Sequence, residues 1–424
     1  MAGNFQGRTS LVRTRRMVIA ATAVLAVAIT VFVATSGAAS SSQASSTRAA
    51  AANADSKALA ATIKKAFFAS IPASKLQPVV RNTLAVASRP LTPAQNRLLQ
   101  TCLKNRSCDT GRGTLTVAIN RDNVNAWVSV YRAEATAQAI ASPQVKRIIY
   151  TSTNGTIAGV LANLRSLVAQ RVDIIVEDSI FGAAIVPVVK QATRAGIAFV
   201  NVNSPLPPAA EAAMTVHIPF DLCAFGRNAA TAVVSRVKPA SAYAFFSGIP
   251  GNVHASTWQP CARRVLDGAG WTQAQAPGWT NWTPQGDSQA ANALLASGKD
   301  VGALFYDAGL DEFLKPFIAA NEKPPAGSSD ALFFSFFKVF QDARGANLSP
   351  LVFVSNARSW FGRLGVTAGV MVKTGQRVPK RVLPPNPVVP FASILSWNKP
   401  GIPAQAPIPV LLTPAQVRLA LSVS

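Results

Sequence analysis

The stretch that most limits the fold runs over residues 169–208, because its pattern fits one arrangement: strand, helix, strand. Residues 173–176 are a short run of Asp, Ile and Val, which is typical of a strand buried on both faces of a parallel sheet. Apolar residues then recur at helical spacing over 181–195, Gly196 follows as a C-cap, and 197–202 is a second apolar strand. A right-handed βαβ crossover is the simplest interpretation.

A sheet of this kind places a ligand site in the loops that follow its strands. In this stretch those loops are residues 177–180 and 203–208, and the second begins with Asn203 and Ser204. We therefore expect a ligand site at this edge of the sheet.

The start of the chain predicts export. The first sixteen residues contain four Arg and no acid, and residues 17–34 are almost wholly apolar. Small residues at 37–39 permit cleavage by a signal peptidase, whereas the apolar run is also just long enough to span a bilayer. Residues 1–38 are thus predicted to be a signal peptide or a membrane anchor, and the body is expected in the periplasm or at the outer face of the cell membrane.

Two segments separate this leader from the body. Residues 39–54 are rich in Ala and Ser, which favours a disordered linker. Residues 55–112 are predicted to be a helical extension with helices over 55–70 and 92–104, the second capped by Thr92. The sequence leaves open whether this extension packs on the body or contacts a partner.

Four cysteines in an exported chain favour two disulfides. Of the three pairings, the most local one joins Cys102 to Cys108 and Cys223 to Cys261. A zinc site is the competing interpretation, but the sequence has no CxxC and its two His are not at ligand spacing. We therefore expect no metal.

The formal net charge of +23 raises the question of nucleic acid. Outside the leader, however, the Lys and Arg are scattered, and neither an aromatic-rich RNA motif nor a helix-turn-helix prefix is present. We expect no nucleic-acid partner and favour a basic body that faces an anionic cell envelope.

Residues 170–173, residues 195–197 and the turn at 248–251, Gly-Ile-Pro-Gly, carry a resemblance to a known family. The chain resembles the ribose and galactose type of periplasmic sugar-binding protein over about residues 114–389. The resemblance implies an α/β fold of the type 1 periplasmic binding protein: two Rossmann-like (flavodoxin-like) lobes with parallel sheets, joined by a three-segment hinge.

The same resemblance divides the chain. It implies that lobe 1 comprises residues 113–216 plus 357–385 and that lobe 2 comprises residues 217–356. Residues 386–424 are rich in Pro and are predicted to be a mostly extended tail that packs on the hinge or on lobe 2.

In lobe 1 the resemblance assigns sugar contacts to Asn125 and Trp127. A pyranose ring presents C–H groups to an aromatic plane and hydroxyls to amides and carboxylates, so a site needs both kinds of side chain. The structural alternative is an N-cap followed by a core Trp. Asn203 and Ser204 stand where the family usually has an asp-arg pair, and both still offer hydrogen bonds to a neutral polyol.

In lobe 2 the resemblance assigns a stacking role to Trp258, where relatives have an arginine, and to Trp282 on the other side of the sugar. Asp307 is expected to bind hydroxyls, with capping of the helix from Leu310 as the alternative.

Two further positions complete the expected site. A strand over 331–337 is predicted to end in Ser335, Phe336 and Phe337, where relatives have gly-phe-asp, so a carboxylate is missing there and Phe336 is the candidate contact. Asn356 is expected at the hinge in place of a glutamine. With three Trp and one carboxylate, the predicted site is less charged and more aromatic than a ribose site.

Enzyme motifs are lacking: the sequence has no GxSxG, HExxH, P-loop or GxGxxG, so no catalytic residue and no cofactor is expected. The resemblance implies a monomeric, exported protein that binds a small sugar-like ligand and passes it to an ABC transporter permease, touching the membrane only through its N-terminal segment. The alternative is a membrane-tethered ligand sensor or an envelope-binding protein of the same fold without a transport role.

Overall fold

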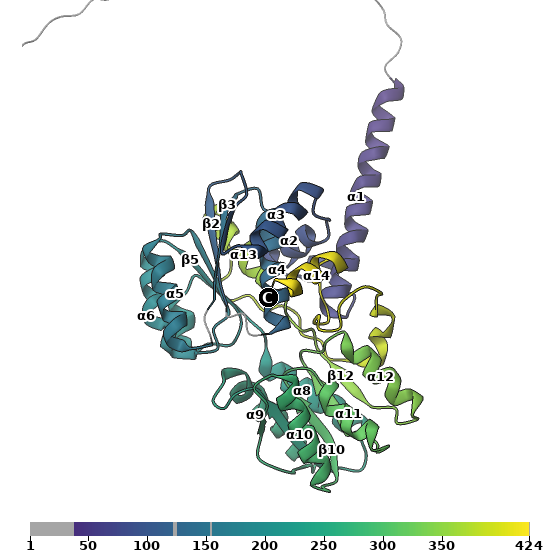
Figure 1. Ribbon diagram of the computed structural model, residues 1–424. Coiled ribbons are helices and arrows are strands. Elements are labelled where there is room, and N and C mark those ends of the chain that lie inside the picture. The colour runs from purple at the N-terminus through teal and green to yellow at the C-terminus, as the bar shows by residue number, and fades with distance from the viewer. Residues whose placement is uncertain (1–37, 122–124, 153–154, 424) are drawn as a thin grey trace, which may run out of the picture. The chain divides into compact units, whose positions relative to one another are not determined.

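The computed structural model describes residues 38–121, 125–152 and 155–423 (Figure 1). The predicted leader lies outside these residues apart from Ala38. The chain divides into two compact units, residues 1–52 and 53–424, and the second unit contains the body. Among the described helices, none combines the length and the apolar character that a membrane crossing needs.

The extension is helical, as expected. It contains α1 (Ala38–Phe67), the short 3-10 turn η1 (Ala73–Lys75), α2 (Pro78–Ala87) and α3 (Pro93–Lys104). Thr92 caps α3 through a capping box with Gln95. The residues expected to form a disordered linker, 39–54, instead lie within α1, in agreement with the high helix propensity of Ala.

Lobe 1 is built on a sheet with the strand order β1-β3-β2-β4-β5-β6. All pairs are parallel except β1 with β3. The strands are β1 (Ser107–Asp109), β2 (Leu115–Asn120), β3 (Val145–Thr151), β4 (Ile174–Glu177), β5 (Ala198–Asn203) and β6 (Val216–Pro219). The extension thus supplies the edge strand β1, and β6 still belongs to this sheet beyond the expected boundary at residue 216.

The predicted βαβ unit is confirmed as β4, a helical segment and β5. The helix expected over 181–195 is a 3-10 turn followed by an α-helix, and Gly196 has the left-handed φ of 78° that ends it. The helices of lobe 1 are α4 (Ala126–Ala141), α5 (Ile157–Ala169), η2 (Gly182–Ile185), α6 (Val186–Arg194), α7 (Pro208–Ala213) and α13 (Phe361–Lys373).

Lobe 2 has a second sheet with the order β13-β12-β11-β10-β7-β8, and β9 also pairs with β7. Its strands are β7 (Ala242–Ser247), β8 (Thr272–Gln273), β9 (Gly278–Trp279), β10 (Val301–Tyr306), β11 (Ala326–Ser329), β12 (Val352–Val354) and β13 (Val389–Pro390). Its helices are α8 (Leu222–Arg236), α9 (Val253–Gly268), α10 (Pro284–Ala296), α11 (Asp311–Ala319), α12 (Ser335–Gly345) and η3 (Phe391–Trp397). Every pair but β12 with β13 is parallel.

The strand expected over 331–337 was wrong. The strand is β11, five residues earlier, and the apolar run that suggested it begins α12 instead. A short apolar run does not distinguish a buried strand from a buried helix, whereas β11 itself is the small, polar sequence Ala-Gly-Ser-Ser. A Cβ added at Gly327 would lie 3.0 Å from the side chain of Leu310, so little room is left for a side chain where β11 passes this residue.

The chain crosses between the lobes after β6, after β12 and again over 374–388, in agreement with the expected three-segment hinge. The tail then differs from the expectation. It pairs with lobe 2 through β13, but its last helix, α14 (Pro414–Ser422), packs on α4 of lobe 1. Buried Glu134 of α4 accepts hydrogen bonds from the backbone N–H groups of Leu411 (2.6 Å) and Leu412 (3.2 Å).

Both predicted disulfides are confirmed. Cys102–Cys108 joins the end of α3 to β1, and Cys223–Cys261 joins α8 to α9. The extension also packs on the body, since the ring of Phe67 lies 5.4 Å from that of Trp360 at the start of α13. The two small lobes are therefore reinforced at their rims by covalent links and by the chain's own terminal segments.

Candidate functional site

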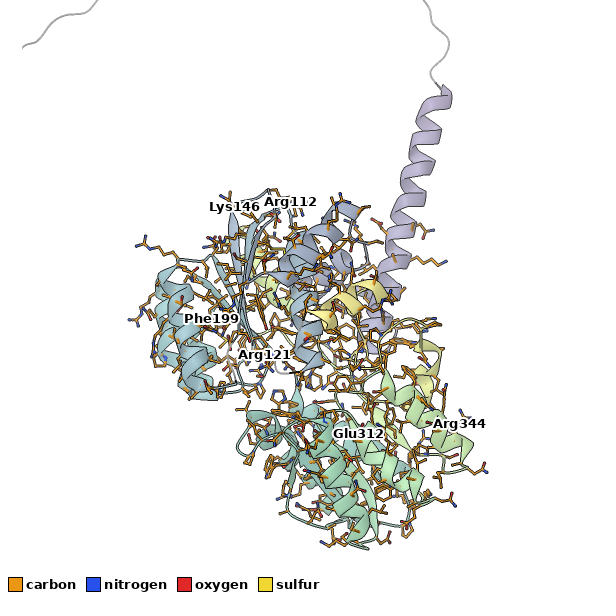
Figure 2. All side chains as sticks on the ribbon, viewed as in Figure 1. Arg112, Arg121, Lys146, Phe199, Glu312 and Arg344 are labelled. Carbon is orange, nitrogen blue, oxygen red and sulfur yellow. A yellow bond between two sulfur atoms is a disulfide. The ribbon has the colours of Figure 1, made fainter. Side chains whose placement is uncertain are left out.

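In lobe 1, polar side chains gather around Asp178, which follows β4 and is 2 % exposed. Its carboxylate accepts hydrogen bonds from Asn203 Nδ2 (3.1 Å) and Ser204 Oγ (2.6 Å), and Arg121 Nε lies 3.2 Å away. Arg121 follows β2 and Asn203 ends β5, so three parallel strands deliver this cluster to one edge. In Figure 2, Arg121 lies at the end of lobe 1 nearer to lobe 2, whereas Arg112 and Lys146 lie at the opposite end.

In lobe 2, the corresponding cluster surrounds Asp307, which follows β10 and is 6 % exposed. The carboxylate accepts hydrogen bonds from Ser247 Oγ (2.7 Å), Trp258 Nε1 (3.0 Å) and Trp282 Nε1 (2.8 Å). Burial, aided by repulsion from Asp330, raises the pKa of Asp307 to about 6. All three donors are neutral, so none of them balances the negative charge of the Asp307 carboxylate.

One hydrogen bond joins the two clusters directly. Ser204 Oγ of lobe 1 and His254 Nε2 of lobe 2 lie 3.1 Å apart, and both residues are buried. Burial, with the positive charges of Arg358 and Arg121, lowers the pKa of His254 to about 3. The imidazole is therefore neutral near pH 7 and exchanges hydrogen bonds without adding charge.

A third group lies where the chain returns from lobe 2. Asp330 follows β11, Arg358 follows β12, and their side chains form a fully buried ion pair at 2.5 Å. The guanidinium also lies 4.0 Å from the ring centroid of Phe220, over which it makes a cation–π contact. Burial raises the pKa of Asp330, while Arg358 opposes this shift.

Several buried polar atoms of these groups have no hydrogen-bond partner among the described residues. They are Asn203 Oδ1, Asp330 Oδ1, Arg358 Nε and both amide atoms of Asn356. Buried polar atoms in native proteins are normally paired, and each exception needs an explanation. A polar ligand held among these side chains supplies one.

Three residues of these groups have a strained backbone conformation. Asn203, Trp282 and Arg358 have left-handed φ values of 66°, 52° and 59°. Such conformations are costly for residues other than Gly and concentrate at functional sites.

Two of the residues expected in lobe 1, Asn125 and Trp127, bond to other parts of the protein itself. Asn125 caps α4 by accepting a hydrogen bond from the Val128 N–H, and Trp127 donates its Nε1–H to the Ala357 carbonyl. The ring of Trp127 stacks on Tyr131 at 5.5 Å and lies 5.9 Å from the Arg121 guanidinium. Both therefore have the structural roles weighed against ligand binding, although Trp127 lies beside the Asp178 cluster through Arg121.

The two tryptophans of lobe 2 differ from each other. Trp258 is fully buried, with its ring against Phe225 and Phe245, so it positions Asp307 and offers no face for stacking. Trp282 is partly exposed, and its ring covers Gly248 so closely that a Cβ there would lie 2.0 Å from the ring. The first position of the Gly-Ile-Pro-Gly turn therefore needs glycine, because the Trp282 ring packs directly against its backbone.

Phe336 is the expected residue that lies elsewhere. It belongs to α12, is fully buried, and packs on Phe391 at 4.7 Å. Its misplacement follows from the strand placed five residues too late. Asp307, in turn, does not cap α11, whose N-cap is Leu310.

Sequence reasoning missed Arg121, His254, Asp330 and Arg358, and it gave no role to Asp178. Relatives have a carboxylate at the end of the strand that we predicted over 331–337, and we expected none here. Asp330, which follows the actual strand β11, is a carboxylate at this place. Arg121, Asp178 and Asp330 all directly follow a strand, which is the signal that indicates them. Asp178 lies in the loop 177–180 where we expected ligand contacts, whereas Asp330 was missed because its strand was placed too late in the chain. The cluster is consequently more charged than we expected. Among the described residues, no group of three or more His, Cys, Asp or Glu is arranged to hold a metal ion.

Comparison with known proteins agrees with this geometry. Residues 117–324 match the family model described as periplasmic binding protein domain. That family is one of binding proteins, and the resemblance inferred from the sequence is confirmed. No curated protein sequence matches the chain significantly.

Solved structures show the same fold at low identity. The arabinose ABC transporter binding protein of Shewanella sp. ANA-3, bound to arabinofuranose, is 16% identical with a TM-score of 0.59, over 67% of this chain and 95% of that one. A solute-binding protein from Bacillus halodurans with myo-inositol is 13% identical with a TM-score of 0.58, over 68% and 98%. A Mycobacterium smegmatis protein in complex with fucofuranose is 17% identical with a TM-score of 0.57, over 73% and 98%. The expected type 1 periplasmic binding protein fold is therefore confirmed.

Proposed function

We propose that the protein is an extracytoplasmic solute-binding protein that captures a sugar or polyol between its two lobes and delivers it to an ABC transporter permease. The observation that carries the proposal is a set of buried polar atoms on Asn203, Asp330, Asn356 and Arg358 that have no hydrogen-bond partner within residues 38–121, 125–152 and 155–423. They come from the strand ends of both lobes and from the crossing between them.

The chemistry of the clusters suits a neutral polyhydroxylated ligand. Carboxylates of Asp178, Asp307 and Asp330 accept hydrogen bonds from hydroxyls, while Arg358 and the amides of Asn203 and Asn356 donate them. The partly exposed ring of Trp282 offers an apolar face to C–H groups. Arabinofuranose, myo-inositol and fucofuranose, bound by the three proteins compared above, are ligands of this class.

Hinge closure is the mechanism that this arrangement supports. A ligand that contacts Asp178 and Asp307 at once stabilises the state in which the lobes meet, because only that state provides both sets of contacts. The Ser204–His254 hydrogen bond forms in the same state and adds to its stability.

The ligand contacts that we propose refine the expected set. We retain Asn203, Ser204, Trp282, Asp307 and Asn356, and we add a further four residues: Arg121, Asp178, Asp330 and Arg358. Asn125, Trp127 and Trp258 are assigned to positioning these groups. The remaining parts of the proposal are export through the N-terminal segment, a monomeric body, the division into lobes near residues 216 and 357, and no partnership with nucleic acid.

A thermal melting experiment tests the function. The protein without its leader is heated in the presence of a panel of pentoses, hexoses and inositols. A ligand at one hundred times its dissociation constant stabilises a protein by about 2.7 kcal/mol, which raises the melting temperature by several degrees. We expect one chemical class to give a shift that Trp282→Ala and Asp307→Ala abolish.

Matched controls are available for both variants. Trp279→Ala removes a neighbouring ring that is 41% exposed, and Asp300→Asn neutralises an exposed carboxylate before β10. Both should keep the ligand shift. A flat panel, or a shift lost equally in the controls, would overturn the proposal.

A further inference from the structure

A second pocket lies in lobe 1, next to the Cys102–Cys108 disulfide. Its volume is about 290 Å³, close to the lower size of small-molecule sites. The charged residues of its lining are Lys104, Arg106 and Arg132, and none of the described residues that line it is acidic. The described part of the wall thus contains three cationic side chains and no acidic one.

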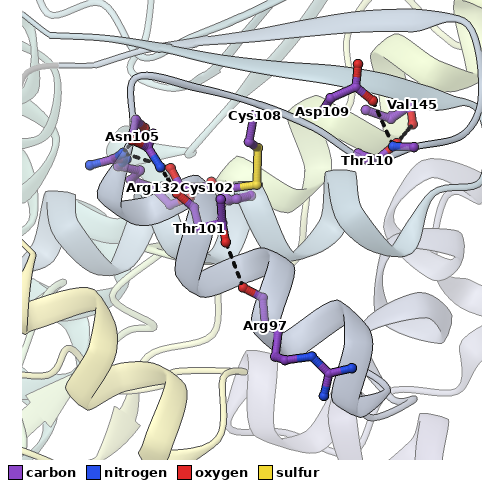
Figure 3. The surroundings of a disulfide bond; sticks show 11 residues. Arg97, Thr101, Cys102, Asn105, Cys108, Asp109, Thr110, Arg132 and Val145 are labelled. Atoms are coloured by element: carbon purple, nitrogen blue, oxygen red, sulfur yellow. Dashed lines mark hydrogen bonds between the residues drawn. A yellow bond between two sulfur atoms is a disulfide. The ribbon is translucent and has the colours of Figure 1, made fainter.

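The wall of this pocket is held on both sides. Lys104, Asn105 and Arg106 lie within the loop that the disulfide closes. Figure 3 shows Asn105 in this loop, beside the disulfide. Directly after them, β1 pairs with β3, and the Tyr150 N–H donates to the Arg106 carbonyl at 2.7 Å. A covalent link and a strand therefore fix the positions of these residues in the absence of any ligand.

Arg132 forms the buried floor of the pocket. It is 8 % exposed, and its guanidinium donates to the carbonyls of Cys102 (3.2 Å) and Asn105 (3.0 Å) at the C-terminal end of α3. The same guanidinium lies 4.0 Å from the ring centroid of Tyr150. Figure 3 shows Arg132 beside Asn105 and the disulfide.

These contacts leave Arg132 incomplete. Its Nε has no hydrogen-bond partner among the described residues, and the same holds for Nδ2 of Asn163, which also lines the pocket. No ion pair with Arg132 is formed in the described part of the chain, and burial lowers the pKa of Arg132. A buried cation without an anion is unfavourable, so an anion bound here removes that cost.

We propose that this pocket is a second ligand site, separate from the interlobe site, and that it binds the oxyanion group of a small molecule, a phosphate or a carboxylate. Arg132 Nε and Asn163 Nδ2 donate to the anion from below, and the side chains of Lys104 and Arg106 approach it from the rim. A planar guanidinium with free donors matches the oxygens of either group.

The main competing explanation is general attraction of anions to a chain with a net charge of +23. The two explanations differ in their dependence on position. A built site depends on the pocket residues, whereas general attraction depends equally on any exposed cation and fades with salt.

The test is isothermal titration of the leaderless protein with orthophosphate and, separately, with succinate, at ionic strength held constant with sodium chloride. We expect saturable binding of one molecule of at least one of the two anions, and the preferred anion identifies the source of the oxyanion group. Arg106→Gln and Lys104→Gln change exposed residues that the fold does not need, and each should weaken binding about tenfold or more, the effect of losing a charge-assisted contact.

Arg97→Gln is the matched control, because Arg97 is exposed on the same helix α3 but does not line the pocket. It should bind the anion with unchanged affinity. Arg132→Lys, which keeps the charge but loses Nε, should weaken binding while the unligated protein still melts cooperatively. Non-saturable binding of both anions, or equal weakening by Arg97→Gln and Arg106→Gln, would overturn the proposal.

Discussion

The two lobes hold their central carboxylates in different ways. In lobe 1, Asp178 has Arg121 beside it together with the donors Asn203 and Ser204. In lobe 2, Asp307 has only neutral donors, two of them indole N–H groups. Burial, together with repulsion from Asp330, raises the pKa of Asp307 to about 6, although the three donors act in the opposite direction. One lobe thus compensates charge with a cation, and the other relies on hydrogen bonds to a carboxyl whose ionisation is disfavoured.

The crossing follows the pattern of lobe 1, since Asp330 is paired with Arg358 and both are buried. The comparison implies that removing the cation beside a buried carboxylate lowers the free energy of unfolding more than removing a neutral donor does.

The largest effect is expected from Arg358→Met. This change leaves Asp330 buried without its cation, and removing one partner of a buried pair costs about 3–5 kcal/mol. Urea denaturation measures the loss in the free energy of unfolding. Arg344→Met on α12 removes an exposed cation and should cost little. A loss for Arg358→Met as small as that of the control would show that the pair is not important for stability.

The next effect concerns the pH dependence of stability and depends on Asp307. Its pKa is about 6 in the folded protein against an ordinary value near 4, so between these values the folded state binds more protons than the unfolded state. This group therefore makes the protein most stable below about pH 4, and its contribution, at most about 3 kcal/mol, is lost as the pH rises to 6.

Asp307→Asn should remove this part of the pH dependence. We expect the free energy of unfolding to fall less between pH 4 and pH 7 in Asp307→Asn than in the unsubstituted protein, measured by urea denaturation at each pH. Asp300→Asn, an exposed carboxylate, should retain the full dependence. Parallel curves for all three proteins would contradict the raised pKa.

A smaller effect is expected from Trp258→Phe. The ring remains in the aromatic core, but Asp307 loses one indole donor, and a hydrogen bond to a charged group contributes about 1.5–3 kcal/mol. The loss should be smaller than that of Arg358→Met. Trp279→Phe is the control for a change of Trp to Phe at an exposed ring. Reversal of the order between Trp258→Phe and Arg358→Met would break the comparison between the lobes.

The smallest effect is expected from Ser204→Ala. This change removes two hydrogen bonds of the Ser204 hydroxyl, one to the Asp178 carboxylate and one with His254. Of these two hydrogen bonds, only the one with His254 joins the two lobes and depends on closure. A neutral hydrogen bond of this kind contributes roughly 1 kcal/mol, so the affinity for the ligand that the melting panel identifies should fall about fivefold. Ser256→Ala, an exposed-rim change on α9, is the control in the same titration. An unchanged affinity for Ser204→Ala would separate this contact from closure.

Local signals in the sequence were sufficient for many elements. Thr92 and Pro93 predicted the start of α3, residues 169–208 predicted the βαβ unit, and the cysteine spacing indicated both disulfides. Each of these features depends on residues close together in the chain or on a periodic pattern. Such interactions are formed within a few residues, so the sequence carries them directly.

The candidate site was predicted less well, because its parts come from strand ends far apart in the chain. Asp330 was missed because β11 is Ala-Gly-Ser-Ser, without the apolar pattern of a strand, and the apolar run after it suggested Phe336. Trp258 was predicted to stack on a ligand, but packing against Phe225 and Phe245 turns its ring into the core.

The sequence by itself was sufficient to predict the fold class through a family resemblance, an export signal, the most local of three disulfide pairings, and the edge of the first sheet at which ligand contacts are expected. Only the tertiary structure decided that Arg121, Asp178, Asp307, Asp330 and Arg358 form connected clusters, and that Arg132 lies buried beneath a disulfide-closed loop. The physical reason is that burial and charge pairing depend on which segments lie close together after folding. The pKa of a carboxylate and its bonding partners are therefore set by residues that are far apart in the chain.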